Sequence, residues 1–147
     1  MCSYCGCRTN TEIARYTREH EVILDTMGEL RRASAAADTA RMQEIVAILA
    51  SQLEPHTLRE ERSLFAEMRK EEEFREHIDG LCAEHTSLDA LVARIAAGEH
   101  AAVEVLYEAL WRHIDKEENG LFPAAIIAID GPTWERIVAL AEVNSTV

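Results

Sequence analysis

The sequence is poor in residues that interrupt helices. Only six of its 147 residues are glycine and three are proline, and aromatic residues make up 5%. Alanine, glutamate, leucine and arginine dominate instead, and these residues favour helix over strand or disorder. We therefore expect an all-α fold, and the length fits one domain with a single sizeable core.

Basic residues are also scarce. The chain has 15 lysines and arginines against 27 aspartates and glutamates, which gives a formal net charge of −12. A field of this sign repels the phosphates of nucleic acids and anionic lipid surfaces. We expect neither nucleic acid nor a membrane to be a partner.

Long apolar runs are missing. The longest spans residues 121–129 and contains Pro123, far short of the roughly 20 residues that cross a bilayer, and the N-terminal segment has no apolar stretch typical of an export signal. Cys2, Cys5 and Cys7 lie close together rather than spread as in a disulfide-stapled secreted fold. We expect a cytoplasmic protein. The three cysteines fit a redox switch, a soft-metal site or no function.

Four segments carry apolar residues at alternating spacings of three and four, which indicates helices with one buried face. They cover residues 13–30, 42–68, 74–97 and 103–121. Thr9 or Thr11 is the expected cap of the first helix. The turn at 130–132 precedes a short fifth helix, for which Thr133 is the expected cap. Long helices with short connections predict an antiparallel, up-down four-helix bundle with a short C-terminal fifth helix.

The ends and one interior position of this pattern depart from regular helix. Residues 1–10 are polar and aperiodic, and we interpret them as a cysteine-containing arm before a domain that covers residues 11–147. Pro55 lies inside the second helical segment. Because proline removes a backbone hydrogen bond and clashes with the preceding turn, we expect this helix to be kinked there or split at about Glu54.

The second and fourth segments contain related sequences. HTLREERSLF (56–65) aligns with HIDKEENGLF (113–122), with the histidine, both glutamates, the leucine and the phenylalanine identical. The other two segments share a weaker echo, Glu-His at 19–20 and at 84–85. The bundle therefore resembles two helical hairpins, each with one lone histidine and one His-x3-Glu motif.

These motifs place six polar side chains in the apolar stripes, because residues four apart lie on the same helix face. A single His-x3-Glu motif would be most simply an exposed ion pair, but here it occurs twice. Each buried polar group without a partner costs about 1–3 kcal/mol. Imidazole and carboxylate suit first-row transition metals, and carboxylates can bridge two ions. The candidate metal ligands are His20, His56, Glu60, His85, His113 and Glu117.

The pattern H…HxxxE…H…HxxxE, with EExxLF in the second helix and HIDKEENGLFPA in the fourth, resembles the hemerythrin, or HHE cation-binding, family over residues 13 to about 129. The resemblance implies an oxo- or hydroxo-bridged di-iron centre held by the six candidate residues, with Glu60 and Glu117 as bridges. Manganese, or zinc with three or four ligands, is the less expected metal, since no closed Cys/His spacing supports zinc.

The sequence departs from the oxygen-carrying members of that family. They have a second histidine one turn after the third-helix histidine and an aspartate in the fourth helix, where this chain has Asp89 and Glu117. The departure argues against reversible dioxygen carriage and makes the site more similar to the iron-sensing and mycobacterial hemerythrin-like branches. We expect Asp89 to face solvent.

Two functions fit this reading. The first is an oxidoreductase that decomposes hydrogen peroxide in a catalase-like manner, or reacts with nitric oxide, since iron supplies the redox chemistry and the bundle a dry cavity. The second is a module that binds or senses dioxygen, nitric oxide or iron without turnover. Iron storage is disfavoured because nothing indicates a cage. The sequence is compatible with a monomer or a homodimer.

Two neighbours of the candidate ligands have open roles. Tyr16 lies one turn before His20, where its phenol hydrogen-bonds to a metal-bound oxygen, replaces the missing ligand or packs in the core. Cys82 lies one turn before His85 and either touches the site or packs as a small hydrophobic residue.

Four further residues have more ordinary expectations. Glu61 and Glu118 directly follow the two candidate bridges, so they point away from the centre, and we expect them to pair with a histidine Nδ1 rather than to ligate. Trp111 and Trp134 are expected to pack between the bundle and the fifth helix.

Overall fold

The computed structural model describes residues 10–143, and this part of the chain is helical apart from short connections. The elements are α1 (Thr11–Ala35), α2 (Thr39–Arg62), α3 (Leu64–Met68), α4 (Glu72–Ala96), α5 (Ala102–Lys116), η1 (Glu117–Leu121), α6 (Phe122–Ala128) and α7 (Gly131–Val143). No helix within these residues is long and apolar enough to cross a membrane. Cys2, Cys5 and Cys7 lie outside the described residues.

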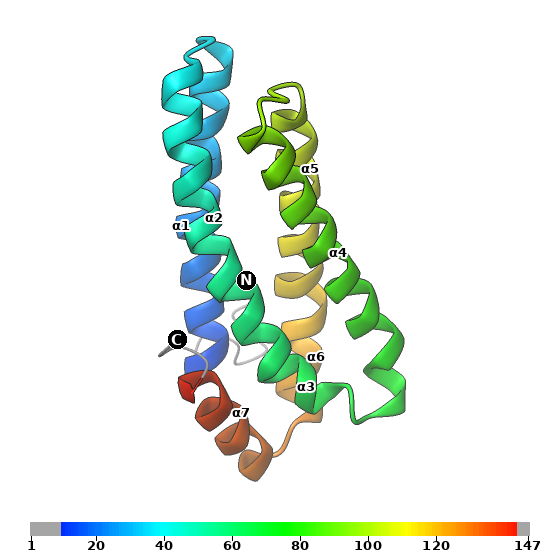
Figure 1. Ribbon diagram of the computed structural model, residues 1–147. Helices are drawn as coiled ribbons and strands as arrows, with labels where there is room; N and C mark the ends of the chain where they lie inside the picture. Colours follow the sequence, from blue (N-terminus) through cyan, green and yellow to red (C-terminus); the bar gives the residue numbers. More distant parts are fainter. Residues whose placement is uncertain (1–9, 144–147) are drawn as a thin grey trace.

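The helices form two antiparallel hairpins that pack side by side (Figure 1). One hairpin is α1 with α2, and the other is α4 with α5; η1 and α6 continue directly from α5. The C-terminal helix α7 lies against the lower end of the bundle (Figure 1). The predicted all-α bundle with a fifth helix is confirmed.

The helix caps differ from those expected. Asn10 caps α1, because its side-chain oxygen accepts hydrogen bonds from the backbone N–H groups of Glu12 and Ile13; Thr11 is already inside the helix. Asp130 takes the role expected for Thr133, since its carboxylate accepts the Thr133 N–H at 2.8 Å. Both predicted caps were wrong by a few residues, because several adjacent residues can cap a helix and the backbone geometry decides among them.

Of the two alternatives expected at Pro55, a kink or a split at about Glu54, the split is wrong. Helix α2 runs without interruption from Thr39 to Arg62 with Pro55 inside it. The neighbours Leu53 and His56 are only 3% and 2% exposed, so packing on both sides holds the helical backbone across the proline. The actual break lies at Ser63, where φ is −123° and ψ is −89°.

The two related sequence segments leave the α-helix in different ways. After Glu60 the chain breaks at Ser63 and resumes as α3, whereas after Glu117 it forms the five-residue π-helix η1. Both solutions bury the Leu-Phe pair that follows, 64–65 and 121–122, in the same apolar cluster. Single-turn π-helices are rare and occur mostly at functional sites, and this one begins at a candidate ligand.

The apolar core consists of two clusters with a polar layer between them. The upper cluster contains Ile23, Leu53, Leu88 and Leu110 among others. The lower cluster, closed by Ile137 of α7, contains Ile13, Tyr16, Leu64, Leu81 and Leu121 among others. Along each long helix and its direct continuation, the candidate metal ligands lie between a residue of the upper cluster and a residue of the lower cluster. The bundle therefore shields this layer at both ends with hydrocarbon.

Candidate metal centre

The structure brings all six candidate ligands together. His20 comes from α1, His56 and Glu60 from α2, His85 from α4, His113 from α5 and Glu117 from η1. All six side chains are buried, with 0–3% exposure, and both glutamates are completely enclosed. Helices α1, α2 and α4, together with α5 and its continuation η1, thus contribute to one enclosed polar cluster.

Four of these residues form one potential ligand group. One ligand atom from each of Glu60, His85, His113 and Glu117 lies within 4.8 Å of all the others. His113 Nε2 lies 2.6 Å from Glu117 Oε1, and His85 Nε2 lies 3.2 Å from Glu60 Oε2. Two imidazoles and two carboxylates around one point are a donor set that suits iron, manganese or zinc.

A second group contains His20, His56 and Glu60. His56 Nε2 lies 3.0 Å from Glu60 Oε1, and His20 Nε2 lies 3.7 Å from the same oxygen. Glu117 Oε1 is 3.8 Å from His20 Nε2 and therefore also reaches this side. Glu60 belongs to both groups, with one oxygen directed to each, and this is the arrangement of a carboxylate that bridges two positions.

The hydrogen bonding of the cluster supports a metal fit. His20 Nε2 and both oxygens of Glu60 and of Glu117 are buried and have no hydrogen-bond partner among residues 10–143. An unsatisfied buried polar atom costs about 1–3 kcal/mol, and more when it is charged. Cations between the carboxylates and imidazoles would satisfy all five atoms at once. The donor set and the unpaired atoms together fit the metal centre that the sequence predicts.

Each of the four histidines has a carboxylate on its outer nitrogen. The Nδ1–carboxylate distances are 2.7 Å for His20 and Glu118, 3.3 Å for His56 and Glu19, 2.8 Å for His85 and Glu61, and 3.3 Å for His113 and Glu84. In every pair the glutamate and the histidine come from different helices, if η1 is counted as the continuation of α5. The four pairs therefore form a closed ring around the bundle. A carboxylate on Nδ1 keeps the proton on that nitrogen and leaves Nε2 for a metal.

Half of this ring was foreseen from the sequence. Glu61 and Glu118 pair with histidine Nδ1 atoms, as expected. Glu19 and Glu84 were missed, although the Glu-His echo at 19–20 and 84–85 marked them. Arg59 hydrogen-bonds to Glu19, and Lys116 Nζ bonds to Glu84 at 2.9 Å. The repeated Glu-His sequence therefore contains two carboxylates, each of which connects a candidate ligand to a positively charged side chain.

The structure also places the residues near the candidate ligands whose roles the sequence left open. The Tyr16 hydroxyl lies 2.7 Å from Ser63 Oγ, and the tyrosine packs in the lower cluster. Cys82 is a half-buried free cysteine that packs against the same cluster. Asp89 is exposed, as expected. The packing expected for Trp134 is observed, since it lies partly buried against the lower cluster. The expectation was wrong for Trp111, which is 54% exposed on α5 because its position falls off the buried stripe.

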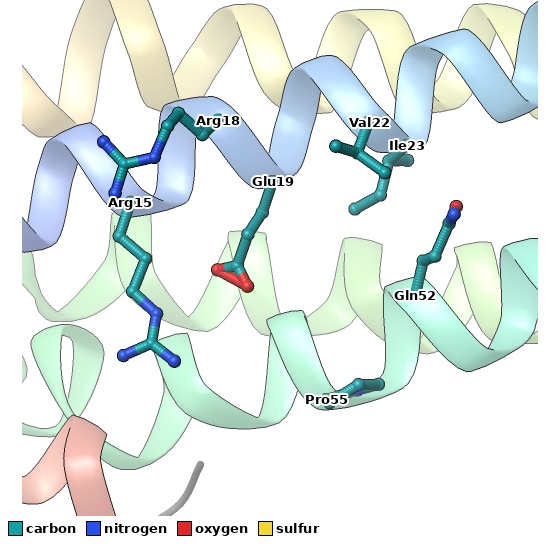
Figure 2. Close-up of a pocket in the computed structure, with 7 residues that line it drawn as sticks. All are labelled: Arg15, Arg18, Glu19, Val22, Ile23, Gln52 and Pro55. Carbon is teal, nitrogen blue, oxygen red and sulfur yellow. The ribbon is translucent and has the colours of Figure 1, made fainter.

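A surface cavity of about 340 Å³ lies outside the His56–Glu19 pair, between α1 and α2. Figure 2 shows Glu19 pointing from α1 toward α2, with Gln52 and Pro55 on the opposite side. Arg15 and Arg18 line the same cavity. Solvent therefore reaches the outer carboxylate of this pair while the imidazole behind it stays 2% exposed.

The carboxylates control the protonation of the cluster. Burial alone would lower the pKa of His20, His56 and His85, but the surrounding carboxylates reverse this and raise the pKa to about 9, 10 and 9, respectively. Burial opposes ionisation of Glu60 as well, yet the adjacent histidines hold its pKa well below the usual range. Burial and the charge of Glu60 raise the pKa of Glu117.

These shifts predict that metal loading releases protons. In the metal-free protein at pH 7.5, each of the three histidines with a raised pKa retains an extra proton. The stabilisation of the fold by these protons is fully present below pH 6.5 and is lost as the pH rises through about 9 to 10. Metal binding requires neutral imidazoles, so loading should release about three protons per chain. A pH indicator in weakly buffered solution measures this, and release of fewer than one proton would contradict it.

This chain forms an antiparallel four-helix bundle with histidines and glutamates gathered in its core, which is the arrangement of metal-binding helical bundles. Residues 11–125 match the model of the hemerythrin HHE cation binding domain, and the chain belongs to this family. The family binds metal ions, typically iron. No curated protein and no solved structure matches the chain.

Proposed function

We propose that the chain holds two iron ions and decomposes hydrogen peroxide. The ligands would be His20, His56, Glu60, His85, His113 and Glu117. The observation that supports this most is the pair of ligand groups that share Glu60. A centre with two adjacent positions suits a substrate whose reduction takes two electrons.

The iron ions would supply the redox chemistry, in which one peroxide is reduced to two waters and a second is oxidised to dioxygen. The residues of the chain position and shield this centre. The apolar clusters above and below the six side chains exclude water. The outer carboxylates Glu19, Glu61, Glu84 and Glu118 hold the protons on the four Nδ1 atoms and fix the direction of each Nε2.

A second candidate is a module that binds or senses dioxygen, nitric oxide or iron without turnover. The hydrogen bonding of Tyr16 favours it, because the hydroxyl lies 2.7 Å from Ser63 Oγ, which donates to the Arg59 carbonyl. The phenol is therefore already hydrogen-bonded away from the six candidate ligands, and no other proton donor near them was identified from the sequence. A binding module needs no such donor.

The test is oxygen evolution from hydrogen peroxide by the iron-loaded chain. We expect one dioxygen per two peroxides consumed, at a rate at least 100-fold above that of the same concentration of free iron, since positioned sites commonly gain this much. The control is the His56→Ala/His113→Ala double variant, checked for helicity. Consumption no faster than that of free iron would reject the peroxide proposal and favour the binding module.

A further inference from the structure

We propose that a groove between α1 and α5 is the port through which iron(II) ions enter the metal centre. The groove encloses about 210 Å³. Its lining includes His20, Glu21 and Leu24 from α1, Trp111 and Asp115 from α5, and Glu118 from η1. The inference rests on the proposed iron site and adds the path by which that site is filled.

The groove ends on a candidate ligand. His20 lines it although the whole residue is only 1% exposed. Its Nε2 has no hydrogen-bond partner in the described part of the chain and lies 3.7 and 3.8 Å from the carboxylates of Glu60 and Glu117. An ion at the inner end of the groove is therefore separated from the buried carboxylates of Glu60 and Glu117 by a single imidazole.

The charge of the groove selects cations. Glu21, Asp115 and Glu118 line it, and no lysine or arginine is among the described residues that do. Clefts lined with one sign of charge concentrate the oppositely charged solute and can raise its association rate by 10- to 1,000-fold. Trp111 is 54% exposed at the same groove, and the face of an indole ring also attracts cations.

Glu118 connects the groove to the centre. Its carboxylate hydrogen-bonds to His20 Nδ1 at 2.7 Å, while its side chain remains 17% exposed. It therefore contacts a candidate ligand and solvent at once. The π-helix η1, which begins at Glu117, carries this residue, so the irregular turn serves both a ligand and the proposed port.

Two other cavities fit iron(II) entry less well. The cavity in Figure 2 carries two arginines, which repel cations. A cavity of about 490 Å³ along α4 is lined by Glu73, Glu76 and Glu84, but the ammonium of Lys116 lines it too. Neither of these two cavities is lined by one of the six candidate ligands.

The test compares two charge-neutralised variants of the full chain. Glu21→Gln/Asp115→Asn removes two charges from the proposed port, and Glu73→Gln/Glu76→Gln removes two from the α4 cavity. All four residues are exposed, so both variants should fold, which circular dichroism checks. Metal-free protein is mixed anaerobically with iron(II) at low ionic strength, and the uptake rate and the final iron content are recorded.

We expect the port variant to take up iron about tenfold more slowly than the parent, with the same final content, and the α4 variant to change less than twofold. An unchanged uptake rate in the port variant, or an equal slowing in both variants, would overturn the port. Failure of the parent to bind iron would instead reject the proposed function.

Discussion

Replacing Glu60 with alanine is expected to reduce the bound metal from about two ions per chain to fewer than one. Glu60 is the only residue that belongs to both ligand groups found among the described residues. Its oxygens lie 3.0 Å from His56 Nε2 and 3.2 Å from His85 Nε2. Losing it removes one ligand from each position and the charge that draws two cations together.

The matched control for this substitution is Glu54→Ala. Glu54 lies on the same helix but is exposed, so its removal should leave the metal content unchanged. Elemental analysis of both purified variants measures the difference. If the Glu60 variant kept two ions per chain, the shared carboxylate would not be a ligand, and the division into two groups would be wrong.

Removing the metal from the parent protein is expected to lower the melting temperature by about 10 °C or more. A ligand present at 1,000 times its dissociation constant stabilises the folded state by about 4 kcal/mol, and each kcal/mol shifts the melting temperature of a domain of this size by about 2–4 °C. Metal loss also leaves the buried carboxylates of Glu60 and Glu117 compensated by neighbouring imidazoles alone. Thermal melts by circular dichroism, with and without a chelator, measure the shift.

The His56→Ala/His113→Ala double variant is the control for the chelator. This variant lacks one imidazole from each group, so its melting temperature should hardly respond to chelation. A parent melt that also ignores the chelator would mean that the six polar side chains satisfy one another without metal, and that the cluster is structural.

The sequence predicted the bundle well because its signal is spread over many residues. Four stripes of apolar side chains with spacings of three and four leave few alternatives to amphipathic helices. The local details were less predictable. Pro55 suggested a break that packing of Leu53 and His56 overrides, whereas the real break at Ser63 carries no helix-breaking residue.

The candidate site was predictable for a similar reason. A duplicated His-x3-Glu motif inside two apolar stripes implies that its members meet in the core, and they do lie together. The outer partners Glu19 and Glu84 were missed, whereas Glu61 and Glu118 were foreseen because they directly follow the two candidate bridging glutamates; all four contact a histidine on another helix. Such contacts depend on how the helices are rotated against one another, which the spacing along one helix does not determine.

The most direct test of the account is the metal content of aerobically purified protein together with its ultraviolet-visible spectrum, measured beside the His56→Ala/His113→Ala variant. The account predicts about two irons per chain, with charge-transfer absorption typical of a bridged iron pair, in the parent alone. Zinc as the only metal, or no metal together with an unchanged helical melt in the variant, would contradict the iron centre and the function built on it.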